Sequence, residues 1–446
     1  MRLTLIKPTI GRPEHSLYVD EARMEPLNLG VLAALTPPDV DVVMYDDRCE
    51  PIPYHQLTDL VAITVETYTA RRSYEIADEY RRRGVRVVMG GFQPTFAPEE
   101  CAEHADALFI GDAETGWAGL VEDARRGDLK KLYSGEPGRP QTGVLTRRDI
   151  YEGKGYLPVS LLQFTRGCRF VCDFCAVTRY FDRKHYIRAI DETLREIESQ
   201  KRRLLFFVDD NIASNRPALK ELCRALIPLR INWVSQASLD VTADAELMKL
   251  MADSGCLGHI MGFESITRGS VKEARKAPNL GKFDQYATQI GILREHGFQT
   301  WAAFTLGYDH DTVDSVRATL DFALSNRFTF AAFNILMPYP GTPLYDRLAR
   351  ENRHLYDGKW WLHPDYRFNA ASFVPARMTP DQLTEVCNEA RREFNRIPSL
   401  LWRFSDLQTN MRTLTRMRAF WRFTPVFRRE VFKKNGMLFG HFGHRA

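Results

Sequence analysis

The chain of 446 residues lacks long apolar runs, internal repeats and low-complexity segments. No uninterrupted apolar stretch approaches the roughly eighteen residues that a membrane-spanning helix needs. The opening segment, residues 2–8, is too short to form the apolar region of a signal peptide. These absences predict a cytoplasmic protein.

Most of the chain also lacks an excess of either positive or negative charge. The formal net charge is +4 and hydrophobic residues make up 44%, which is typical of a folded globular protein. From Ile397 onward, however, the chain has ten Arg or Lys residues, and its only acidic residues are Asp406 and Glu430. Aromatic residues alternate with the basic ones. Two interpretations stay open. We favour a helical cover with its arginines in solvent, and the alternative is a surface that contacts a membrane or nucleic acid.

Three of the eight cysteines lie close together, at Cys168, Cys172 and Cys175, and the other five are scattered. Scattered cysteines favour a reducing compartment over disulfides. The spacing lets a short loop place three thiolates on three irons of a cubane cluster, which leaves the fourth iron without a protein ligand. That iron can be chelated by the amino and carboxylate groups of S-adenosylmethionine (SAM). A structural zinc site is the alternative, but it needs four ligands and the next candidate, His185, lies ten residues further on.

The pattern Cys-x-x-x-Cys-x-aromatic-Cys, with Phe174 as the aromatic residue, resembles the fingerprint of the radical SAM superfamily. Over most of its length the chain is similar to the branch that carries a cobalamin-binding-like domain ahead of the radical SAM barrel. The resemblance implies that an electron from a [4Fe-4S] cluster cleaves SAM to a 5'-deoxyadenosyl radical. It also implies a reducing partner such as flavodoxin or ferredoxin.

Hydrophobic periodicity predicts two α/β domains. Five short apolar runs alternate with amphipathic segments at the start of the chain, which is typical of a doubly wound, Rossmann-like parallel sheet. Six further strand–helix units predict a partial (β/α)6 barrel. The aromatic segment at residues 359–368 is expected to fold over the barrel mouth. We expect the Rossmann-like domain at 1–135, a linker at 136–158, the radical SAM barrel at 159–345 and a helical, basic cover region at 346–446.

The resemblance assigns SAM-binding roles to residues at the ends of the predicted barrel strands. A carboxylate of Asp209 or Asp210 would accept hydrogen bonds from the SAM ammonium. Glu264 would accept from the ribose hydroxyls, Lys276 would reach the SAM carboxylate, and the backbone of Leu306–Gly307 would pair with adenine. The residues expected to bind SAM are Phe174, Asp209, Asp210, Gln236, Ser238, Glu264, Lys276, Leu306 and Gly307.

Whether cobalamin binds is left open by the sequence. The motif Asp-x-His-x-x-Gly, whose histidine binds cobalt in some cobalamin enzymes, is absent, and Gln93 stands where related sequences often have the histidine of Gly-Gly-x-His. Lys7 and Glu66, at the ends of predicted strands, are the catalytic candidates. An unpaired Glu66 carboxylate facing an apolar corrin edge would be costly to desolvate, which favours a domain without cobalamin.

The resulting expectation is an enzyme that abstracts hydrogen from a small biosynthetic intermediate. Dehydration, deoxygenation or rearrangement in natural-product biosynthesis would follow. The alternative is a cobalamin-dependent methyltransferase that acts on carbon of a natural product or a hopanoid-type lipid. A third hypothesis is a nucleic-acid or membrane-surface binding protein with a structural cluster. Nucleic acid is not expected as a partner, whereas peripheral membrane contact through the basic C-terminal region stays open.

Overall fold

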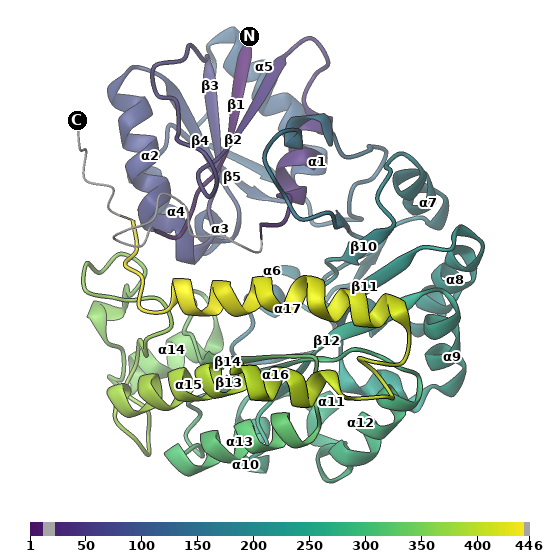
Figure 1. Ribbon diagram of the computed structural model, residues 1–446. Coiled ribbons are helices and arrows are strands. Elements are labelled where there is room, and N and C mark those ends of the chain that lie inside the picture. Colours follow the sequence, from purple (N-terminus) through teal and green to yellow (C-terminus); the bar gives the residue numbers. More distant parts are fainter. Residues whose placement is uncertain (12–22, 441–446) are drawn as a thin grey trace. The chain divides into compact units, whose positions relative to one another are not determined.

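The computed structural model describes residues 1–11 and 23–440, and the chain forms two compact units (Figure 1). The N-terminal unit comprises Met1–Leu157, Tyr356–Phe368 and the chain from Gly436 onward. The barrel unit comprises Pro158–Leu355 and Asn369–Asn435. Each unit contains a parallel sheet with helices, which confirms the predicted α/β class. The limits predicted along the sequence (1–135, 136–158, 159–345 and 346–446) remain our proposal for the order of domains.

The N-terminal unit is built on a six-stranded parallel sheet in the order β2-β1-β3-β4-β5-β6. The strands are β1 (Arg2–Lys7), β2 (Asp41–Asp46), β3 (Leu60–Thr64), β4 (Arg86–Gly90), β5 (Ala107–Gly111) and β6 (Leu132–Gly135). The helices are α1 (Leu27–Leu35), α2 (Ala70–Arg82), α3 (Phe92–Phe96), α4 (Pro98–His104) and α5 (Trp117–Arg126). The sequence missed β6, because this edge strand is short and its side chains are not buried. The strand order reverses at β1 and β3, and doubly wound sheets bind ligands beyond the carboxyl ends at such a point.

Two later segments complete the N-terminal unit. The Tyr68 ring lies 5.1 Å from Trp360 and 5.8 Å from Phe439, and the Phe368 amide donates to the Met437 carbonyl. Trp360 is fully buried. The segment expected over the barrel mouth therefore packs as part of the interior of the N-terminal unit. Sequence periodicity gave no sign of this, because the contact depends on residues far apart along the chain.

The barrel unit contains a six-stranded parallel sheet in the order β14-β13-β12-β11-β10-β7. Its strands are β7 (Ser160–Leu162), β10 (Leu204–Phe207), β11 (Asn232–Ala237), β12 (Cys256–Glu264), β13 (Trp301–Leu306) and β14 (Phe330–Ile335). The helices up to the last strand are α6 (Ala176–Phe181), α7 (Ile190–Glu198), α8 (Arg216–Leu226), α9 (Ala245–Asp253), α10 (Arg268–Glu273), α11 (Ala277–Leu280), α12 (Tyr286–Glu295) and α13 (Val313–Ser325). Neighbouring strands follow chain order, as in a partial barrel, so their carboxyl ends meet at one edge.

After the last barrel strand, the described residues form the α-helices α14 (Pro343–Arg350), α15 (Pro380–Phe394), α16 (Ile397–Phe404) and α17 (Leu414–Lys434). Thr379 caps α15 by accepting from the Gln382 amide, which fixes the start of that helix. On α17 the Phe427 ring lies 4.8 Å from Trp301 and 5.2 Å from Phe330. The C-terminal region is therefore helical, as predicted, and one side of α17 packs on barrel strands. No helix in the described part of the chain is both long enough and apolar enough to cross a membrane.

Candidate active site

The three clustered cysteines lie in the loop between a small strand pair and α6. The strand β8 (Thr165–Arg166) pairs with β9 (Tyr186–Ile187) in antiparallel fashion and fixes the base of the loop. Gly167 begins the loop with φ 86°, and a Cβ there would lie 2.3 Å from the Lys184 carbonyl oxygen. Only glycine fits this close approach. Cys172 is buried, whereas Cys168 and Cys175 are half-buried. Three thiolates in one short loop fit the ligand set of a [4Fe-4S] cluster.

Asp209 and Asp210 hold the strand that enters this loop. The fully buried Asp209 carboxylate accepts from the Phe164 amide at 2.9 Å and from the Thr165 amide and hydroxyl, both at 2.8 Å. Asp210 accepts from the Gly167 amide at 2.7 Å. Burial raises the pKa of Asp209 to about 7, although these hydrogen bonds oppose the shift. Contact of either aspartate with the SAM ammonium stays a prediction, whereas their contacts with the loop could not be inferred from the sequence.

Glu264 and Lys276 form a buried ion pair at the end of β12. Lys276 Nζ lies 2.8 Å from Glu264 Oε1, and Thr305 Oγ1 donates to Glu264 Oε2 at 2.8 Å. A Cβ on Gly262 would lie 2.4 Å from Glu264 Oε1 and 2.8 Å from Lys276 Nζ, so a larger residue there would displace the ends of both side chains. Burial alone would lower the pKa of Lys276, but Glu264 and Cys172 raise it. The Lys276 ammonium is thus held between a carboxylate and the cysteine loop.

Phe174 and the end of β13 lie together. The Phe174 ring is 6.4 Å from the Tyr308 ring in an edge-to-face contact. Gly307 has φ 110°, and a Cβ there would lie 2.7 Å from a Leu383 methyl group. Tyr308 is fully buried, and the described residues provide no hydrogen-bond partner for its hydroxyl. A buried, unpaired hydroxyl beside the cysteine loop fits a site that takes a polar ligand. The sequence placed Tyr308 directly after Leu306–Gly307 at the end of this strand but predicted no role for its side chain.

The two remaining predicted residues belong to the group around Asp209. Gln236 Nε2 donates to the Asp209 carbonyl at 3.2 Å, and Ser238 Oγ accepts from Asn211 Nδ2 at 2.9 Å. The structure therefore arranges the predicted SAM residues in three groups. One surrounds Asp209 at the ends of β10 and β11, a second surrounds Glu264 at the end of β12, and the third joins Phe174 to the end of β13. Their roles toward SAM remain predictions.

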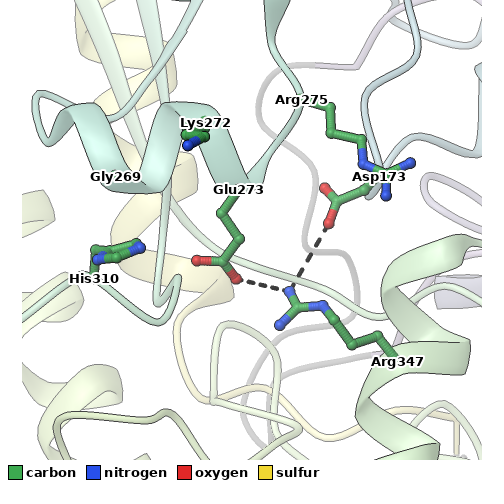
Figure 2. A pocket seen from close by; sticks show the side chains of 7 residues that line it. All are labelled: Asp173, Gly269, Lys272, Glu273, Arg275, His310 and Arg347. Carbon is green, nitrogen blue, oxygen red and sulfur yellow. Dashed lines mark hydrogen bonds and ion pairs between the residues drawn. The ribbon is translucent and has the colours of Figure 1, made fainter.

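A cavity of about 430 Å³ adjoins the cysteine loop, as Figure 2 shows. It is lined by Asp173, Gly269, Lys272, Glu273, Arg275, His310 and Arg347. The Arg347 guanidinium contacts three carboxylates. It lies 2.7 Å from Glu273 Oε1 and 3.8 Å from Asp173 Oδ2 (Figure 2), and 3.1 Å from Asp309 Oδ2. Burial raises the pKa of Asp173 to about 6, and nearby arginines oppose the shift. The sequence missed this group, because its members come from separate elements and share no motif.

In the N-terminal unit, Lys7 and Glu66 lie where the strand order reverses. Lys7 ends β1, Glu66 follows β3, and Lys7 Nζ lies 2.8 Å from Glu66 Oε1. The Lys7 ammonium lowers the pKa of Glu66, whose side chain is 53% exposed. The sequence-based objection to cobalamin assumed an unpaired carboxylate. That assumption is wrong, because the structure pairs Glu66 with a lysine.

Gln93, which stands in the place of the expected histidine, is fully buried in the N-terminal unit. Its Nε2 donates to Glu100 Oε1 at 3.0 Å. The same oxygen accepts from the Tyr74 hydroxyl at 2.8 Å and from Trp361 Nε1 at 2.9 Å. Gln93 therefore joins an interior hydrogen-bond network. A role for it as a ligand at the sheet edge is not supported by these contacts.

Comparison with known proteins places this site in a family. Residues 162–323 match the model of the radical SAM superfamily. The chain is 31% identical over 353 residues to bacteriochlorophyllide d C-8(2)-methyltransferase of Chlorobaculum tepidum, which covers 73% of this chain and 77% of the relative. It is 28% identical over 421 residues to bacteriochlorophyllide d C-12(1)-methyltransferase of the same organism, covering 91% and 90%.

Two solved structures share the fold. One is the radical SAM methyltransferase TsrM of Kitasatospora setae, with cobalamin and [4Fe-4S] cluster bound. Its TM-score is 0.61 at 19% sequence identity, and the match covers 78% of this chain and 75% of the TsrM chain. The cobalamin-dependent SAM radical enzyme OxsB has a TM-score of 0.63 at 15% identity and covers 97% and 71%.

The chain belongs to the radical SAM superfamily, in the branch with a cobalamin-binding-like domain ahead of the barrel. It is a radical SAM enzyme that uses a [4Fe-4S] cluster and SAM and acts on a small molecule with a reductant. These findings confirm the family resemblance. They support the methyltransferase alternative better than the dehydration, deoxygenation or rearrangement expected first, and they do not support lyase chemistry.

Proposed function

We propose that the protein is a cobalamin-dependent radical SAM methyltransferase that transfers a methyl group to a carbon of a small molecule. The supporting observation is the extent of similarity to the bacteriochlorophyllide d C-12(1)-methyltransferase. It spans 91% of this chain, whereas the radical SAM match alone covers residues 162–323. The likeness thus includes the N-terminal sheet as well as the barrel. Because the N-terminal sheet is shared with a methyltransferase, we infer that it binds cobalamin while the barrel binds the cluster and SAM.

When bound, the cluster supplies the electron that cleaves SAM, and cobalamin supplies a carrier for the methyl group. In this proposal Cys168, Cys172 and Cys175 hold the cluster. The Glu264–Lys276 pair offers a carboxylate and an ammonium to the polar groups of SAM. Because Thr305 and Lys276 each hold one oxygen of Glu264, the carboxylate is oriented before SAM arrives.

The N-terminal sheet fits cobalamin at its switch point. Lys7 ends β1, Glu66 follows the neighbouring strand β3, and together they carry no net charge. A neutral pair can face an apolar corrin edge without leaving an isolated charge to desolvate. Neither residue is an imidazole, and the buried Gln93 is already bonded to Glu100. In this proposal the corrin therefore rests on an ion pair and receives no histidine from the sheet edge.

A tetrapyrrole is the substrate class that we propose. The names of two relatives specify bacteriochlorophyllide d, and this chain covers 90% and 77% of their lengths. A further relative at 26% identity is an anaerobic magnesium-protoporphyrin IX monomethyl ester cyclase of Cereibacter sphaeroides. Similarity to several enzymes named for tetrapyrroles supports a large, flat, ring-shaped substrate over a small polar one.

The test uses protein produced with abundant cobalamin and purified without oxygen. We expect corrin to copurify with the cluster. With reductant, a bacteriochlorophyllide and SAM labelled in its methyl group, we expect labelled product together with S-adenosylhomocysteine and 5'-deoxyadenosine. Both by-products are required because one SAM serves as methyl donor and a second as radical source. Formation of 5'-deoxyadenosine without corrin and without S-adenosylhomocysteine would contradict methyl transfer.

A further inference from the structure

The helices α16 and α17 and the loop between them expose an unusual number of large apolar side chains. We call this the C-terminal surface. Its apolar members are Ile397, Leu401, Trp402, Leu407, Leu414, Trp421 and Phe432. The Phe404 ring joins the two helices, since it lies 5.3 Å from Phe420 and 5.0 Å from Trp421. Figure 1 draws both helices in yellow shades on the barrel unit.

On α17 the exposed apolar residues form one row. Leu414, Trp421 and Phe432 are separated by seven and eleven residues, which is about two and three turns of an α-helix. Their side chains are 59%, 43% and 41% exposed. Residues at this spacing share a face. The three side chains therefore lie on one side of the helix, with about three turns between Trp421 and Phe432.

A basic row lies beside the apolar one. Arg418, Arg422, Arg429 and Lys433 are all exposed and are spaced by four, seven and four residues. They therefore lie along one side of the helix as well. Within α17 the only acidic residue is Glu430. The C-terminal surface thus combines an apolar row with a flank of positive charge.

The inner side of α17 already accounts for the covering role expected from the sequence. Phe427 packs on Trp301 and Phe330, and Phe420 and Thr424 are buried. Packing on the barrel therefore requires none of Leu414, Arg418 or Arg422. The outer residues need a different explanation.

We propose that the C-terminal surface binds the headgroup region of a membrane that contains anionic lipids. The apolar row enters the boundary between headgroups and acyl chains, and the basic row contacts anionic headgroups. An amphipathic helix with arginines beside leucine and aromatic residues binds a bilayer surface in this way. This inference is independent of the proposed methyl transfer, because binding to vesicles is measured without substrate.

Charge and shape argue against two other partners. A second copy of the chain, joined by a twofold axis, would place this positive surface against itself, where like charges repel. Single-stranded nucleic acid would stack on Trp421 and Phe432. It would leave Leu414, Leu401 and Ile397 exposed, since aliphatic side chains offer no stacking face. An anionic bilayer engages both the apolar and the basic residues.

The experiment is cosedimentation of the full-length, cluster-loaded protein with vesicles. One preparation is phosphatidylcholine alone and the other contains phosphatidylglycerol. We expect binding to the anionic vesicles that weakens as salt is raised, and little binding to phosphatidylcholine. Arg418→Gln and Arg422→Gln should each lower the partition coefficient about fivefold, since a basic residue near an anionic surface contributes about 1 kcal/mol. Leu414→Ser and Phe432→Ser should each lower it about tenfold.

Matched controls come from other parts of the surface. Lys201→Gln removes an equal charge, and Leu57→Ser removes an apolar side chain that is 88% exposed. Neither should change partitioning. All variants should still yield 5'-deoxyadenosine from SAM, which shows that they are folded.

Four outcomes would overturn the proposal. They are equal binding to both kinds of vesicle, no binding to either, displacement of vesicles by single-stranded nucleic acid, and a dimer in light scattering that Leu414→Ser dissociates.

Discussion

Lys276 Nζ lies 2.8 Å from Glu264 Oε1, and both groups are largely buried beside the cysteine loop. Glu264 has φ 62°, a left-handed conformation that costs a residue other than glycine about 1 kcal/mol or more. The conformation persists because Lys276 and Thr305 hold both carboxylate oxygens. The pair is thus part of the fold as well as of the candidate site.

Breaking this pair should destabilise the protein. Lys276→Met leaves the buried Glu264 carboxylate without its cation, and the free energy of unfolding should fall by about 3 kcal/mol. Adding Glu264→Gln should recover part of the loss, because no buried charge then lacks a partner. Denaturant unfolding of the cluster-free protein measures both. The exposed Lys272→Met serves as control and should change stability by less than about 0.5 kcal/mol. Strictly additive losses in the double variant would show that the two side chains are not coupled.

Loss of one clustered cysteine should abolish cluster binding. Cys172→Ala leaves two thiolates in the loop, too few to hold the cubane. Iron and sulfide content should fall to background after anaerobic reconstitution, and reduction with SAM should give no 5'-deoxyadenosine. Cys49→Ser, at a half-buried cysteine of the N-terminal unit, is the matched control and should keep both. Full SAM cleavage by Cys172→Ala would contradict the assignment.

Asp209→Ala should act through the cysteine loop. It leaves the Phe164 amide and the Thr165 amide and hydroxyl without their acceptor, at about 1–3 kcal/mol for each buried group. We expect Asp209→Ala to contain less iron per protein than the unchanged chain. The iron content of Asp209→Asn should lie between the two, because asparagine keeps one acceptor oxygen. A direct contact with the SAM ammonium predicts the opposite pattern. The iron content would then be unchanged and SAM affinity would fall about tenfold to a hundredfold. Iron analysis together with a SAM titration separates the two.

The sequence located these residues through their spacing and their positions at strand ends, which are local signals. It could not supply their partners. Asp209 was expected to face SAM, yet its oxygens accept from a strand more than forty residues earlier, at Phe164 and Thr165. Such pairings follow from the order of strands in the sheet. No periodicity within β10 encodes which neighbour lies beside it.

The Lys7–Glu66 pair should control retention of corrin. Lys7→Met leaves the Glu66 carboxylate unpaired at the switch point, so protein produced with abundant cobalamin should retain less corrin. Lys7→Met with Glu66→Leu should retain more than Lys7→Met alone, because no isolated charge then faces the corrin. Visible absorption of the purified protein gives the stoichiometry. Equal retention in all three proteins would place the corrin away from this pair.

Lys7 and Glu66 also show where inference from the sequence ends. Both were identified as strand-end residues, but an unpaired carboxylate was assumed and cobalamin was disfavoured on that ground. Their contact exists because β1 pairs with β3 in register. A doubly wound pattern does not specify that order. Likewise, the cavity around Asp173 and Arg347 unites a loop and a helix that are far apart along the chain, so it has no sequence signature.

The N-terminal unit is assembled from segments far apart along the chain, and this affects the order in which the two units can fold during synthesis. Proteins emerge from the ribosome with the amino end first, and N-terminal domains generally fold first during synthesis. Here Tyr68 packs on Trp360 and Phe439, so the first unit to be translated has to wait for the last described residues before its core is complete. The barrel unit, which contributes most of the chain in between, is translated while those contacts are still missing. The N-terminal unit therefore begins to be translated first, but the last residues of its core are translated after those of the barrel unit.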